Sequence, residues 1–132
     1  FDDALMLNDR GKISEASGAN LFIVRNGTLI TSPVNGDILE GITRRSIAKF
    51  ARDLGIALEE REIDRSELYV ADEAFLCGTG AQVAAIGNID GRPVGNGERG
   101  PITQRIQEVF FACVKGEDPR YGDLLTKVPV RP

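Results

Sequence analysis

The feature that most constrains this fold is an Asn-Gly pair, Asn26-Gly27, set between two apolar runs. Residues 21–24 (Leu-Phe-Ile-Val) precede the pair, and Leu29-Ile30 follows it closely. Asn-Gly is a preferred dipeptide of two-residue hairpin turns, because both positions need backbone angles that Asn and Gly adopt at little cost. The sequence therefore predicts an antiparallel hairpin in which both strands carry large apolar side chains.

Two segments carry the period of an amphipathic helix. In the first, Ile47, Phe50, Ala51 and Leu54 recur at helical spacing, and Gly55 ends the segment. In the second, Pro101 is expected as the first helical residue. Arg44, Arg45, Lys49, Arg52 and Asp53 are expected outside the apolar face of the first helix, and Ile102, Ile106, Val109, Phe110, Cys113 and Val114 on the apolar face of the second.

Further strands are expected around these helices, at residues 4–7, 57–63, 73–77 and 82–89. Asp64 offers a cap for a short helical turn through Tyr69. Strands and helices mix without a strict βαβ repeat, which favours an α+β (irregular α/β) fold. The length of 132 residues suits a single domain covering residues 1–132. Because the chain opens in a strand without Met, we expect further residues upstream.

Composition narrows the class of function. There are 16 Lys and Arg against 20 Asp and Glu, and no basic run, which argues against binding nucleic acid or an anionic membrane surface. No stretch approaches the roughly 20 apolar residues of a membrane-spanning helix, so a cytoplasmic protein is expected. Histidine is absent, and the two cysteines, Cys77 and Cys113, are expected to be buried and reduced, with no metal site. Any acid or base chemistry would then depend on Lys, Asp, Glu or a cofactor.

Two short segments are candidates for binding an anion. Gly41-Ile42-Thr43 opens the first helix, where free N–H groups and the Thr43 hydroxyl could hold a phosphate, or where Thr43 could simply cap the helix. Gly78-Thr79-Gly80 lies between two apolar strands and is either a backbone nest for an anion or an ordinary strand connection. It is not a P-loop, because no Gly-Lys-Ser/Thr follows.

The third candidate is Glu15, which precedes a run of small residues, Ala16 to Ala19. It is either a surface charge or a buried acid awaiting a cationic partner. The small residues leave room for a flat group close to the backbone. Two possible anion sites and one acid beside a planar space together suggest a phosphorylated aromatic cofactor.

Four motifs occur in register: SEASGANLFIV, LEGITR, ELYVADEAFLCGTGAQV and IDGRPVGNGERGPITQRIQEVFF. In this order and spacing they resemble the carboxyl-terminal, cofactor-binding part of the fold-type IV pyridoxal-phosphate aminotransferases. The long closing segment is more similar to the branched-chain amino acid aminotransferases than to the D-amino acid aminotransferases or aminodeoxychorismate lyases of the same fold, which remain the alternatives.

The resemblance implies a role for individual residues around pyridoxal 5'-phosphate. Glu15 matches the acid that pairs with the pyridine nitrogen, and Asn20 a polar residue supporting it. Ile42 and Thr43, after Gly41, match the donors to the phosphate. Thr79 matches a further phosphate ligand, Thr79 and Gly80 the turn that receives the substrate carboxylate, and Leu39 the apolar residue packed on the ring.

The resemblance also implies a reaction and partners. A branched-chain aminotransferase moves the amino group of L-Leu, L-Ile or L-Val to 2-oxoglutarate and is expected to be a homodimer. Its amino-terminal domain and Schiff-base lysine belong upstream of Phe1, so residues 1–132 alone are expected to be inactive. A non-catalytic binding domain that has kept the fold is a further alternative.

Overall fold

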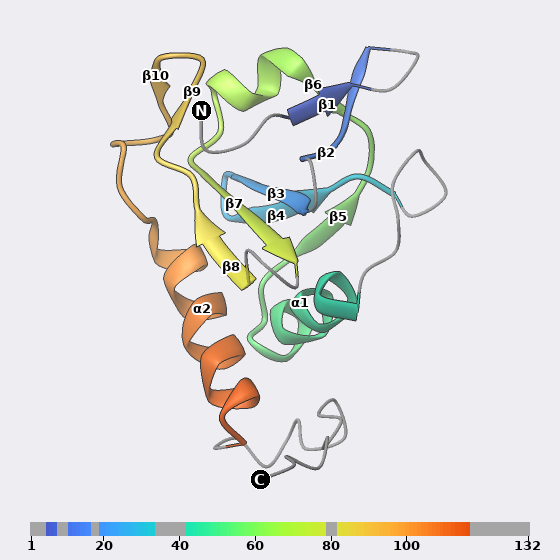
Figure 1. Cartoon of the computed structure of the whole chain (residues 1–132), viewed down its shortest axis with the longest axis vertical. Coiled ribbons are helices and arrows are strands. Elements are labelled where there is room, and N and C mark those ends of the chain that lie inside the picture. The colour runs from blue at the N-terminus through green and yellow to red at the C-terminus, as the bar shows by residue number, and fades with distance from the viewer. Residues whose placement is uncertain (1–4, 8–10, 17–18, 34–41, 79–81, 117–132) are drawn as a thin grey trace, which may run out of the picture.

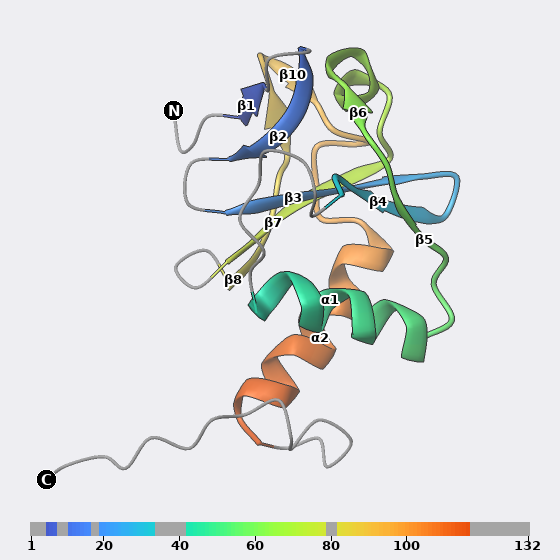
Figure 2. The ribbon, with the colours of Figure 1, turned by 90° about the vertical axis from the view of Figure 1, so that its right-hand side faces the viewer.

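The computed structural model describes residues 5–7, 11–16, 19–33, 42–78 and 82–116. In this part of the chain a mixed sheet, in the order β5-β4-β3-β7-β8, forms the middle layer. Helices α1 and α2 cover one face, and the sheet β1-β2-β6, the turn η1 and the hairpin β9-β10 lie on the other side (Figures 1 and 2). The elements are β1 (Leu5–Leu7), β2 (Lys12–Ala16), β3 (Asn20–Arg25), β4 (Thr28–Thr31), α1 (Ile42–Asp53), β5 (Leu58–Glu60), β6 (Ile63–Asp64), η1 (Arg65–Tyr69), β7 (Glu73–Gly78), β8 (Gln82–Ala85), β9 (Asn88–Ile89), β10 (Arg92–Pro93) and α2 (Pro101–Val114).

The predicted hairpin is confirmed as β3 and β4. The strands pair antiparallel, with Ile23 opposite Ile30 and Arg25 opposite Thr28. Asn26 and Gly27 form the turn with φ values of 51° and 77°. Both angles are positive, as the tight hairpin turn requires, and this explains why Asn and Gly occupy these positions.

The apolar run of β3 is continuous because the strand is covered on both faces. Phe22 and Val24 pack towards the helices, while Leu21 and Ile23 pack into a second core on the opposite side. All four are at most 2% exposed. Successive side chains of a strand point to opposite faces, so two cores require apolar residues at every position.

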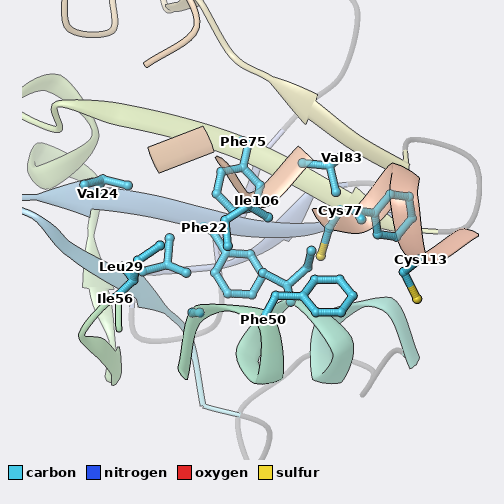
Figure 3. Packing of buried hydrophobic residues seen from close by; sticks show 13 residues of the cluster. Phe22, Val24, Leu29, Phe50, Ile56, Phe75, Cys77, Val83, Ile106 and Cys113 are labelled. Carbon is cyan, nitrogen blue, oxygen red and sulfur yellow. The ribbon is translucent and has the colours of Figure 1, made fainter. Parts of the chain in front are cut away.

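The core between the sheet and the helices is built around three phenylalanines. The rings of Phe22 and Phe75 stack with centroids 5.1 Å apart. Figure 3 shows them gathered with Phe50 of α1, and each is fully buried. The spacing of Ile47, Phe50 and Ala51 therefore marks the packed face of α1, as the sequence predicts.

Two predicted strands are wrong as continuous elements. Residues 57–63 divide into β5, which pairs parallel with β4, and β6, which pairs with β2 in the other sheet. Residues 82–89 divide into β8 of the main sheet and β9, which pairs with β10. In both segments the chain leaves one layer for another, and alternation of apolar residues continues across the crossing because each layer has its own core.

Both helices begin where the sequence predicts, but two side chains were misplaced. Arg44 was expected outside the apolar face of α1 and is only 3% exposed. Val114 was expected on the apolar face of α2 and is 51% exposed. It is the last residue of α2, at the end of the helix that projects beyond the sheet in Figure 1. Neither described helix is long and apolar enough to span a membrane.

The carboxylate of Glu67 in η1 binds two arginines. Arg61 donates to both oxygens at 2.8 Å, and Arg25 of β3 donates to Oε2 at 2.9 Å. The backbone N–H of Asp64 donates to Oε1 at 3.2 Å, as the predicted cap requires. The hydrogen bonds from Arg61, with these further donors, lower the pKa of Glu67 from 4.5 to about 2.

This shift predicts a pH dependence of stability. Because the folded pKa lies below the unfolded value, the stabilisation by Glu67 is present above pH 4.5 and is lost as pH falls towards about 2. We expect Glu67→Gln to lower the free energy of unfolding by about 1–2 kcal/mol near neutral pH and by almost nothing near pH 2, as measured by urea unfolding. Glu108→Gln, on the exposed side of α2, is the control. A loss that does not change with pH would contradict the prediction.

Candidate functional site

The predicted site segments meet on one side of the molecule, at the left in Figure 2. The end of β2, the first turn of α1, the end of β7 and the start of β8 all lie there. Cys77 near the end of β7 pairs with Asn20 at the start of β3. Gly78, the last residue of β7, pairs with Gln82 of β8. Segments far apart in sequence thus converge where the sequence analysis expected a cofactor.

The seven predicted site residues divide into two groups. Glu15 lies in β2, Ile42 is the first residue of α1, and Thr43 is the second and is half-buried. The others, Leu39, Gly41, Thr79 and Gly80, lie outside the described residues, but their neighbours Ile42, Gly78 and Gln82 are placed on this side.

The first turn of α1 has an unusual charge distribution. It contains Arg44 and Arg45 and no acidic residue. A helix N-terminus carries a partial positive charge and free N–H groups, so cations there are unfavourable and an anion is favoured. Arg44 adds a buried positive charge at this position. The end of α1 is therefore strongly suited to an anionic group such as a phosphate.

Arg44 is the residue that sequence reasoning missed. Its Nη2 donates to the carbonyl oxygen of Ser32 at 2.7 Å and lies 3.5 Å from a carboxylate oxygen of Glu60. Its Nε has no hydrogen-bond partner among the described residues. One signal could have found it, since Arg44 precedes Ile47 and Ala51 by three and seven positions and so lies on the buried stripe of the helix.

Two further residues of this region are buried. Asn20 is 8% exposed and opens β3. Cys77 is fully buried, and this burial raises the pKa of its thiol to about 12, although the nearby charge of Arg44 acts in the opposite direction. A thiol with this pKa stays neutral at physiological pH and is a poor nucleophile. Cys77 and Cys113 are both buried and free, as the sequence predicts.

The chemistry available in the described part of the site is that of binding and positioning. The described residues contain no group of three or more His, Cys, Asp and Glu side chains placed for a metal ion. The helix end offers backbone N–H groups, the hydroxyl of Thr43 and a buried cation. These groups can hold and orient an anionic molecule.

Comparison with known proteins defines the class. The family model described as amino-transferase class IV matches residues 1–89. The chain belongs to the class IV aminotransferase family.

Its relatives include branched-chain aminotransferases. A protein of Aquifex aeolicus described as a probable branched-chain-amino-acid aminotransferase is 50% identical over 97% of this chain and 42% of its own length. The branched-chain-amino-acid aminotransferase of Pseudomonas aeruginosa is 42% identical over 96% of this chain and 41% of its own length. The chain spans about two fifths of the length of these relatives.

Solved structures give the same fold. The branched-chain aminotransferase of Thermoproteus uzoniensis with norvaline has a TM-score of 0.90 and 51% identity, over 95% of this chain and 41% of that one. The branched-chain amino acid aminotransferase of T.th., complexed with N-(5'-phosphopyridoxyl)-L-glutamate, has a TM-score of 0.91 and 42% identity, over 95% of this chain and 42% of that one. The expected α+β fold of these aminotransferases is confirmed.

Proposed function

We propose that this chain is the carboxyl-terminal, cofactor-binding domain of a branched-chain amino acid aminotransferase. The observation that supports this best is the similarity of nearly the whole chain to enzymes of that name, at 42–51% identity in solved structures with TM-scores of 0.90–0.91. The whole protein would transfer the amino group of L-Leu, L-Ile or L-Val to 2-oxoglutarate. We propose that it is cytoplasmic and acts as a homodimer.

The proposed cofactor is pyridoxal 5'-phosphate. The residues present fit its phosphate, because the first turn of α1 has no acidic residue and carries a buried arginine whose Nε has no partner among the described residues. Gly41, Ile42 and Thr43 would hold the phosphate at this helix end, with Thr79 as a further ligand. When bound, the cofactor withdraws electrons from the α-carbon of the amino acid.

The other proposed residues bind and orient the reacting groups. Glu15 would keep the pyridine nitrogen protonated, and buried Asn20 would support this acid. Leu39 would pack on the face of the ring. Thr79 and Gly80 would receive the substrate carboxylate. The lysine that binds the cofactor and the amino-terminal domain would come from parts of the whole protein outside this chain.

The reaction with single amino acids tests the proposal. We expect L-leucine, added alone to the whole protein with bound cofactor, to convert the cofactor to its amino form, because one half of a transamination needs no keto acid. The absorbance of the bound cofactor measures this conversion, and D-alanine is the matched control. Conversion by D-alanine but not L-leucine would instead indicate a D-amino acid aminotransferase. No conversion by either would favour a lyase of the same fold or a binding domain.

A further inference from the structure

A chain of buried hydrogen bonds links the strand that carries Glu15 to the helix turn that carries Thr43. Ser32 follows directly after β4, and its hydroxyl donates to the carbonyl oxygen of Ile13 in β2 at 2.9 Å. The carbonyl oxygen of the same Ser32 accepts a hydrogen bond from Arg44 Nη2 at 2.7 Å. Ser32 is 7% and Arg44 3% exposed, so water does not compete for these bonds.

The two ends of this bridge lie beside the proposed cofactor ligands. Ile13 is two residues before Glu15 on the same strand, and Arg44 is the neighbour of Thr43 in the first turn of α1. Glu15 is the proposed partner of the pyridine nitrogen, and Thr43 is a proposed partner of the phosphate. The bridge therefore runs between the residues that would bind opposite ends of one molecule.

The bridge is also rigid. Ser32 is held at a strand end, because β4 is paired on both sides, with β3 and with β5. Arg44 makes a second contact, 3.5 Å from a carboxylate oxygen of Glu60 at the end of β5. A planar guanidinium fixed at two points holds its geometry better than a flexible ammonium would. The first turn of α1 is thus tied to the ends of two adjacent strands.

Arg44 is costly for a purely structural tie. Burying a charge costs several kcal/mol unless it is well paired, and an apolar side chain of similar volume is often as stable or more stable. The helix N-terminus adds a further unfavourable term. Glu60, its described ionic partner, is 44% exposed and only 3.5 Å away, and Arg44 Nε has no partner among the described residues. This arrangement is more consistent with a role at the site than with stability alone.

We propose that Ser32 and Arg44 are positioning residues, which set the spacing between the pyridine end and the phosphate end of the cofactor site. The inference rests on the proposed function. Neither residue needs to touch the cofactor, since Ser32 acts through β2 and Arg44 through the first turn of α1. A ligand held at both ends gains affinity only when the two half-sites have the correct separation.

Paired titrations with two ligands test this. The whole protein, freed of cofactor, is titrated with pyridoxal phosphate and with pyridoxal, which lacks the phosphate and engages only the ring end. We expect Ser32→Ala and Arg44→Lys each to lower the ratio of the two affinities about tenfold, because displacement of a binding group by a fraction of an ångström to about 1 Å is costly. Ser32→Ala leaves both half-sites intact, and Arg44→Lys keeps the charge.

Matched controls separate positioning from general damage. Ser66→Ala and Arg45→Lys make the same chemical changes at exposed positions and should leave the ratio within about twofold. A variant that merely loosens the fold weakens both ligands alike and does not move the ratio. A ratio unchanged in both Ser32→Ala and Arg44→Lys would overturn the inference, and Ser32→Ala decides alone if Arg44→Lys does not fold. If the unmodified protein itself binds pyridoxal as tightly as pyridoxal phosphate, the proposed phosphate site is wrong instead.

Discussion

Replacing Glu15 by Gln in the whole protein is expected to lower kcat about 10²–10³-fold while the cofactor stays bound. A carboxylate beside the pyridine nitrogen favours its protonated form, and the protonated ring accepts electrons from the substrate. A neutral amide removes that stabilisation and keeps almost the same shape. The measurements are kcat with L-leucine and 2-oxoglutarate, and the absorbance of the bound cofactor.

The control is Glu98→Gln, the same change at an exposed position between β10 and α2. It should leave kcat and the absorbance unchanged. If Glu15→Gln keeps kcat within about threefold of the unmodified protein, Glu15 is not the acid on the pyridine nitrogen, because such a small effect is far below that of a removed electrostatic partner. If the variant instead loses the cofactor altogether, Glu15 acts chiefly in binding.

Local signals predicted the elements of this fold well. Asn26-Gly27 located the hairpin because few residue pairs fit two successive positive φ angles. Pro101 located the start of α2 because its missing N–H is not needed there. Such signals depend on a few adjacent residues, so one sequence is enough to interpret them.

Signals that depend on distant neighbours were not predictable. The strand at residues 82–89 was expected to continue through Gly87, where the chain in fact crosses to the β9-β10 hairpin. A Cβ on Gly87 would lie 2.7 Å from the carbonyl oxygen of Gly97, so this glycine permits a close approach between two loops. Nothing local to Gly87 identifies the segment that it meets.

The same distinction applies to the site. Thr43 could be proposed from its place at a helix start, but the bridge through Ser32 and Arg44 joins residues that are 12 positions apart and come from separate elements. Charged residues are usually exposed, and this general rule led to the wrong placement of Arg44. The resemblance to a family supplied roles for motif residues, whereas the supporting contacts required the structure.

The second large effect concerns Glu73, the first residue of β7, which caps α2 from a different element. Its Oε1 accepts a hydrogen bond from the backbone N–H of Thr103 at 2.7 Å, and Oε2 from that of Ile102 at 3.2 Å. Glu73 is only 6% exposed. We expect Glu73→Ala to lower the free energy of unfolding by about 2–4 kcal/mol, because buried N–H groups lose a charged partner at a helix N-terminus. Urea unfolding measures this, with exposed Glu98→Ala as the control.

Gly100 makes the prediction sharper. Its φ of −83° and ψ of 170° suit alanine as well as glycine, so Gly100→Ala introduces no backbone strain. A Cβ there would, however, overlap the carboxyl group of Glu73. We therefore expect Gly100→Ala to destabilise the unmodified protein and to cost much less in the Glu73→Ala background, where the carboxyl group is gone. Additive losses would show that Gly100 and Glu73 act independently, and the carboxylate would then not be the group that fixes the start of α2.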